Sequence, residues 1–106
     1  PVTNQIENYP YFAQTKLVNF TAKFGCTTTA YGPLGSPGLM GVKLLDDEVL
    51  IKIAEKHGAT PAQIALAWNM HRGVAVIPKC TTIERIKENY DALDIKLDDE
   101  DVEEIN

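Results

Sequence analysis

The sequence is poor in cysteine and in long apolar runs, and each shortage excludes a class of protein. Its two cysteines, Cys26 and Cys80, lie far apart and match neither a disulfide framework nor metal-ligand spacing, so we expect reduced thiols in a cytoplasmic protein. No apolar run reaches the roughly 18 residues of a membrane-spanning helix, and no charged-then-apolar leader opens the sequence. We therefore expect neither a metal site nor a membrane partner.

Positive charge is also scarce. Ten basic residues stand against fifteen acidic ones, which gives a net charge of −5, and acids dominate the segment from Asp98 to Glu104. A nucleic-acid-binding domain normally carries a basic face. We therefore expect no nucleic-acid partner, and any phosphate site must be local and built from a few residues.

What the sequence does contain is an alternation of strand and helix patterns. Apolar alternation and β-branched runs predict strands at residues 2–7, 26–31 and 74–77, the last covered on both faces. Caps and helical spacing predict helices over 14–24 before Gly25, over 47–57, from Thr60 as a buried helix, from Thr82, and over 98–105. This order predicts βαβ units with a parallel sheet, in one domain spanning residues 1–106.

Polar and aromatic side chains gather where the predicted strands end. Gln5, Tyr31 with the glycine–proline loop after it, and Lys79 before the helix start at Thr82 all fall at carboxyl ends, where parallel α/β folds bind ligands. An amide, an aromatic face, a glycine-bearing loop and a cation beside a helix N-terminus suit an aromatic ring with phosphates.

Each of these residues also has a purely structural explanation. Lys79 could be a solvated strand end, and Tyr31 an aromatic at the edge of the core. Arg85 and Glu88 stand three residues apart, so they could pair along one helix face. The residues taken singly therefore leave the ligand site open, and only their combination favours it.

Four segments, taken in order, carry a resemblance to a known family. They are N-Q-I-E-x-x-P-Y at 4–11, A-Y-G-P-L-G-S-P at 30–37, T-P-A-Q-I-A-L-A-W at 60–68 and V-I-P-K-C-T-T-I-E-R-I-x-E-N at 76–89. In order and spacing they resemble the C-terminal half of an aldo-keto reductase. The resemblance implies the C-terminal portion of a (β/α)8 TIM barrel, with about three parallel strands and covering helices, in an enzyme that uses NADPH to reduce aldehydes and ketones.

The resemblance also implies which residues touch the nicotinamide and pyrophosphate. Gln5 matches the residue that holds the nicotinamide carboxamide, and Tyr31 matches the aromatic that stacks on the nicotinamide ring. Gly32, Leu34 and Ser36 match the loop that closes over the pyrophosphate.

Six further residues are implied to bind the adenosine end of NADP(H): Lys79, Cys80, Thr82 and Arg85 around the 2′-phosphate, and Glu88 and Asn89 at the adenine. The family usually has serine at the positions of Gly32 and Cys80, and often an acid where this chain has Gly38. The hydroxyl lost at Cys80 removes one hydrogen bond worth about 0.5–1.5 kcal/mol. We expect a weaker hold on the cofactor with the preference for NADPH retained.

No catalytic residue is expected within this chain. The family's proton donor is a tyrosine assisted by a lysine, an aspartate and a histidine from the first half of the barrel, and reduction of a carbonyl requires such a donor. We therefore expect the cofactor-binding half of a longer polypeptide that also binds a small carbonyl substrate. The alternatives are a non-catalytic half-barrel that self-associates through open sheet edges, or a nucleotide-binding module without chemistry.

Overall fold

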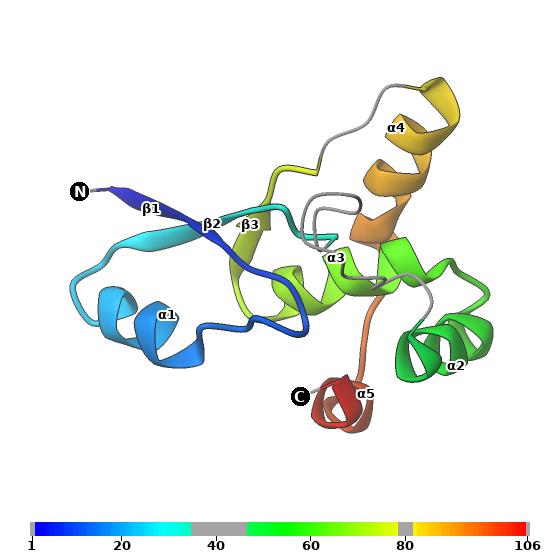
Figure 1. The fold of residues 1–106 in the computed structure, drawn as a ribbon, viewed down its shortest axis with the longest axis horizontal. Helices are drawn as coiled ribbons and strands as arrows, with labels where there is room; N and C mark the ends of the chain where they lie inside the picture. The colour runs from blue at the N-terminus through cyan, green and yellow to red at the C-terminus, as the bar shows by residue number, and fades with distance from the viewer. Residues whose placement is uncertain (1, 35–46, 79–81, 106) are drawn as a thin grey trace.

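The computed structural model describes residues 2–34, 47–78 and 82–105, and their arrangement is drawn in Figure 1. The elements, in chain order, are β1 (Thr3–Glu7), α1 (Thr15–Ala22), β2 (Thr27–Tyr31), α2 (Glu48–His57), α3 (Pro61–His71), β3 (Val74–Val76), α4 (Ile83–Asp91), the 3-10 helix η2 (Ala92–Asp94) and α5 (Asp99–Ile105).

The three strands form one parallel sheet in the order β1-β2-β3. Its register pairs Thr3 with Thr27 and Glu7 with Tyr31, and on the other side of β2 it pairs Thr28 with Val74. Each strand is joined to the next by at least one helix, as parallel strands require. The predicted alternation of strands and helices is confirmed, and β1 and β3 are the edges of the described sheet.

The helix ends form where local chemistry predicts them. Thr60 and Gln63 make a reciprocal capping box, with the Gln63 N–H donating to Thr60 Oγ1 at 3.2 Å and the Thr60 N–H to Gln63 Oε1 at 3.0 Å. Gly25 adopts φ 73° and its N–H donates to the Ala22 carbonyl, while the Cys26 N–H reaches the Thr21 carbonyl. This is the hydrogen-bond pattern of a glycine C-terminal cap, so the helix stops before Gly25 even though its last regular residue is Ala22.

The core is organised around α3. Its consecutive residues from Ile64 to Asn69 are all buried, and Trp68, Ile64 and Leu66 are fully so. They meet the buried face of α2 at Leu50, and α3 also contacts β3, α4 and η2 (Figure 1). The prediction that this helix is buried is confirmed, because a helix that is apolar around most of its circumference must be covered on most sides.

The two faces of the sheet differ in cover. Ala30 and Val74 are buried on the face that the helices cover, whereas Ala75 and Ile77 are exposed. The prediction that the third strand is covered on both faces is therefore wrong for the described residues. A continuous apolar run is the usual sequence of a strand with both faces covered, but the described helices cover only the Val74 face of β3.

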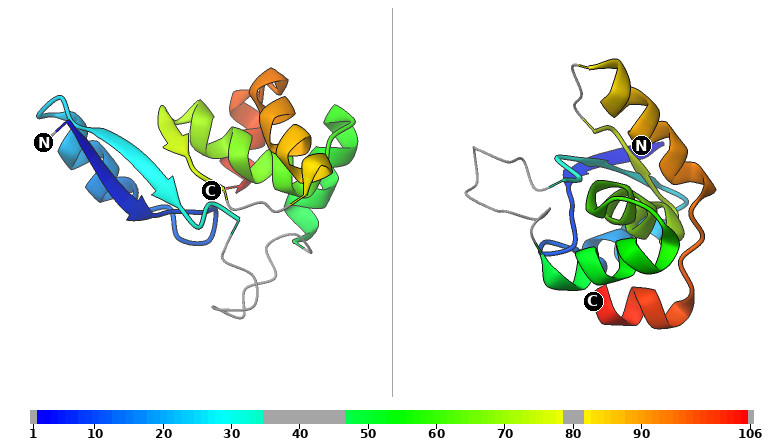
Figure 2. Two further views of the ribbon diagram at one scale, coloured as in Figure 1. Left: turned by 90° about the horizontal axis from the view of Figure 1, so that it is seen from above. Right: turned by 90° about the vertical axis from the view of Figure 1, so that its right-hand side faces the viewer.

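A buried carboxylate fastens α5 to α2, which lie side by side in Figure 2. Asp101 is 3% exposed and accepts from His57 Nε2 at 2.7 Å and from Lys56 Nζ at 2.9 Å. Burial alone would raise the pKa of Asp101, but these hydrogen bonds outweigh it and lower the pKa from 3.8 to about 2. The charged carboxylate therefore stabilises the folded state.

Replacing Asp101 by asparagine should lower the free energy of unfolding by about 2 kcal/mol at neutral pH, the equivalent of this pKa shift. Because the folded-state pKa lies below the ordinary one, the contribution is complete above about pH 4 and is lost as the pH falls toward about 2. Denaturant unfolding at a series of pH values measures both effects. The control is Glu104→Gln on α5, the helix that carries Asp101; it breaks an exposed ion pair with Lys52 of α2 and should cost less than about 1 kcal/mol. If the two variants lowered the free energy of unfolding equally, the stabilising role of the buried Asp101 carboxylate would be contradicted.

Candidate cofactor site

Gln5 and Tyr31 share one face of the sheet near its carboxyl edge. Glu7 is the register partner of Tyr31, so the two side chains project to the same side, and Gln5 lies two residues before Glu7 on that same side. Both candidate residues are exposed, Tyr31 at 44%. Tyr31 is therefore not a covered core aromatic in the described chain, and its ring is available to a planar ligand.

The loop after β2 starts with a turn that glycine favours. Gly32 has φ 58°, in the left-handed region where a side chain is disfavoured. Pro33 is fully buried, and Leu34 packs against the core cluster. The start of the loop is thus anchored below the sheet edge. The Leu34 side chain faces the protein, and Ser36 lies outside the described residues.

The third part of the site is the N-terminus of α4. The carboxyl ends of the parallel strands lie at one edge, and the chain leads from β3 to α4 (Figure 1). Thr82 is the N-cap, its Oγ1 accepting from the Arg85 N–H at 3.3 Å. A capped helix start presents a positive dipole end that favours an anion. Lys79 and Cys80 lie outside the described residues.

Arg85 is exposed, and no ion pair joins it to Glu88 in the part of the chain that the structure describes. The structural explanation that these two residues neutralise each other is therefore not what the structure shows. Glu88 and Asn89 are half-buried one turn further along. The Glu88 carbonyl accepts from Gln63 Nε2 at 2.9 Å, which ties this face of α4 to α3.

A buried polar cluster that sequence reasoning missed lies directly after β1. Asn8 and Asn69 are both 0% exposed, and Arg72 Nη1 donates to the side-chain oxygens of both, at 3.1 and 3.2 Å. The Arg72 guanidinium also lies 4.4 Å from the Trp68 ring centroid, and burial lowers the pKa of Arg72. Asn8 and Arg72 are 64 residues apart, so no local sequence pattern could have joined them.

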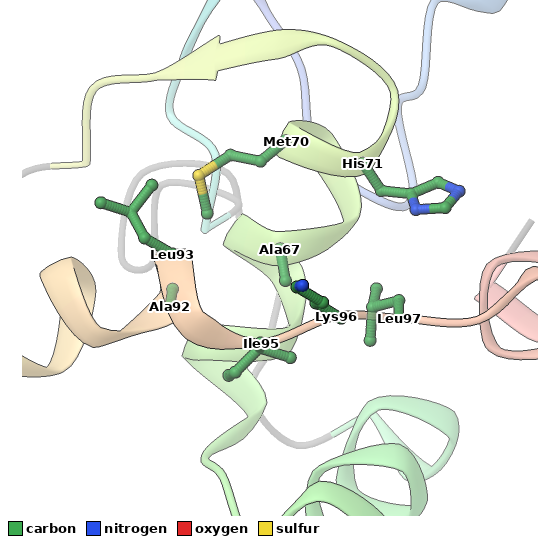
Figure 3. Close-up of a pocket in the computed structure, with 8 residues that line it drawn as sticks. All are labelled: Ala67, Met70, His71, Ala92, Leu93, Ile95, Lys96 and Leu97. Carbon is green, nitrogen blue, oxygen red and sulfur yellow. The ribbon is translucent and has the colours of Figure 1, made fainter.

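An open cavity among the described residues lies elsewhere. It has a volume of about 400 Å³ between α3 and the segment after α4, and Figure 3 shows Met70 and Leu93 directed toward the same space. Met70 and His71 end α3, which two residues separate from the amino end of β3 at Val74, so the cavity is away from the carboxyl edge. None of the predicted cofactor residues that the structure describes lines it: its residues are Ala67, Met70, His71, Ala92, Leu93, Ile95, Lys96 and Leu97.

Within the described ranges, no group of three or more histidine, cysteine, aspartate or glutamate side chains is arranged to hold a metal ion. The helices of this same part of the chain are all too short or too polar to cross a membrane.

The described strands form a parallel sheet with helices on one face and with side chains suited to ligand binding at its carboxyl edge. This arrangement is typical of a portion of a larger parallel α/β fold. Comparison with known proteins identifies that fold. A sequence model of the aldo/keto reductase family matches residues 1–106. The chain is 44% identical to aldo-keto reductase family 1 member D1 of Mus musculus, with 100% of this chain and 34% of that protein aligned.

Solved structures agree with the sequence match. The aldose reductase from Schistosoma japonicum superposes with a TM-score of 0.91 at 38% identity, covering 100% of this chain and 33% of the other. A Gox0644 variant in complex with NADPH superposes with a TM-score of 0.90 at 41% identity, covering 99% of this chain and 37% of the other.

The chain belongs to the aldo-keto reductase family. Its fold is the C-terminal portion of that family's (β/α)8 barrel, as predicted. The family comprises oxidoreductases that reduce aldehydes and ketones with NAD(P)H. The chain spans about a third of the length of the relatives it matches.

Proposed function

We propose that this chain is the cofactor-binding half of an NADPH-dependent reductase of small aldehydes and ketones, within a longer cytoplasmic polypeptide. One observation carries the proposal: Gln5 and Tyr31 project, exposed, from the same face at the carboxyl edge of the sheet. Family membership supports it, since a structurally similar relative was solved with NADPH. The free, buried thiol of Cys26 is consistent with a reducing compartment.

The proposed contacts with the cofactor come from two strands and one helix. NADPH, when bound, supplies the hydride. Tyr31 offers a flat ring that leaves the opposite nicotinamide face open, and Gln5 offers an amide to the carboxamide. The N-terminus of α4 and the Arg85 guanidinium favour a phosphate by dipole and by charge. The predicted 2′-phosphate ligands Lys79 and Cys80, and the adenine contacts Glu88 and Asn89, complete the proposed set.

The proposal assigns proton donation to residues outside this chain. The carbonyl oxygen must take up a proton as the hydride arrives, so a general acid has to stand beside it. No role in this step is assigned to Tyr9, which is buried in the core cluster, or to Tyr90, which lies on α4.

A second candidate is a half-barrel that pairs with another copy of itself. It is favoured by the apolar side chains that α4 leaves exposed, Ile83 at 83%, Ile86 at 54% and Tyr90 at 72%, and by the two edge strands. In the leading proposal the rest of the polypeptide covers these surfaces.

Intact mass in the native source separates the two candidates. An antibody against residues 82–91, which are α4 with its N-cap, would isolate the protein for mass spectrometry. The leading proposal expects a mass about three times that of this chain, because the relatives are about three times as long. It also expects aldehyde-dependent oxidation of NADPH. A native protein of this chain's own 11.7 kDa mass would refute the leading proposal.

Arg85→Ala should weaken binding of NADPH far more than binding of NADH, because only NADPH carries the 2′-phosphate. Loss of one hydrogen bond to a charged group corresponds to about 10- to 100-fold in Kd. Fluorescence titration of both cofactors, on the polypeptide at its native length, gives the ratio. Lys87→Ala removes an exposed cation from the same helix and should leave that ratio unchanged. If both variants lowered NADPH and NADH affinity alike, Arg85 would not be the 2′-phosphate ligand.

A further inference from the structure

Asn8 is a three-way junction at the end of β1. Its N–H donates to the Tyr31 carbonyl at 3.3 Å. Its own carbonyl accepts from Asn69 Nδ2 at 3.2 Å, and its Oδ1 accepts from Arg72 Nη1 at 3.1 Å. A single buried residue therefore joins the carboxyl ends of β1 and β2 to α3.

Arg72 makes further contacts besides the one with Asn8. Its second nitrogen, Nη2, donates to the Ala13 carbonyl at 2.9 Å, and Nη1 also reaches Asn69 Oδ1. The guanidinium stacks on Trp68, which is fully buried in the core. Because three contacts other than Asn8, namely Ala13, Asn69 and Trp68, fix the guanidinium, it sets the position of the Asn8 amide rather than following it.

The junction lies next to both candidate nicotinamide residues. Tyr31 contributes the carbonyl that Asn8 binds, and Gln5 precedes Asn8 by three residues on β1, an edge strand of the described sheet. Besides the ladder to β2 and the Gln14 amide, which donates to the Glu7 carbonyl, the end of β1 is held through Asn8. Asn8 is bound by Asn69 in the last turn of α3 and by Arg72, the C-cap of that helix.

We propose that Asn8 and Arg72 are positioning residues, which hold Gln5 and Tyr31 in the arrangement that recognises the nicotinamide carboxamide. The inference rests on the proposed function. It assigns a role in cofactor recognition to the buried Asn8 side chain and the partly buried Arg72 side chain, which would act on the cofactor only through Gln5 and Tyr31.

The test compares NADPH with its analogue in which an acetyl group replaces the carboxamide, on the polypeptide at its native length. The Kd of the acetyl analogue divided by the Kd of NADPH reports how strongly the protein binds the carboxamide. Gln5→Leu should bring this ratio close to one. Asn8→Leu, similar in size but without the acceptor, should lower the ratio about threefold to tenfold, the range of one neutral hydrogen bond. Asn8→Asp keeps an acceptor for Arg72 and should retain most of the ratio.

Adenosine 2′-phosphate provides the readout that separates positioning from general destabilisation. It probes only the α4 end of the site, so its Kd should stay the same in Asn8→Leu. Should Asn8→Leu not fold, Arg72→Lys applies the same test, because lysine keeps the charge but lacks the fork. It should lower the ratio similarly.

The outcomes distinguish the two levels of the proposal. An unchanged ratio in Gln5→Leu would overturn the proposed role of Gln5, and the positioning inference with it. A changed ratio in Gln5→Leu with no change in Asn8→Leu or Arg72→Lys would overturn the positioning inference alone. Equal losses for NADPH, its analogue and adenosine 2′-phosphate would also overturn it, since they would show general destabilisation.

Discussion

The burial of α3 is the interaction on which the rest of the structure depends. Trp68, Ile64 and Leu66 are fully removed from water between the sheet and the other helices, and burial of a large apolar side chain is worth roughly 1.5–3 kcal/mol. The same helix then holds the site at two places. Gln63 near its start binds the Glu88 carbonyl of α4, and Arg72 at its end binds Asn8 after β1. The proposed nicotinamide and adenosine ends are thus both fastened to one rigid element.

The uncovered face of the sheet explains why structure and function point to a larger assembly. In the family's barrel fold, the faces of the strands that lie away from the helices fill the interior, and ligands bind at the carboxyl end. Here Gln5, Tyr31 and Ala75 stay exposed on that side, and β1 and β3 each have one neighbour. The exposed sheet face leaves Gln5 and Tyr31 accessible. The edge strands and the apolar side chains of α4 are exposed as well, and in the proposed full-length protein the rest of the polypeptide covers them.

Much of the fold was predictable from the sequence because its signals are local. The Thr60 capping box, the glycine at the end of α1 and the buried α3 all depend on residues a few positions apart, and all are confirmed. The family was predictable for a related reason, since four motifs recur in order. The roles of the cofactor residues remain predictions. The Asp101 and Asn8 contacts span 44 and 64 residues, so no local pattern could have shown them.

A crystal structure of the native-length protein with bound NADPH would show where the cofactor lies. We predict the nicotinamide ring stacked on Tyr31 with its carboxamide at Gln5, and the 2′-phosphate at Arg85 by the start of α4. Cofactor density away from the carboxyl edge, for example in the cavity between Met70 and Leu93, would contradict it.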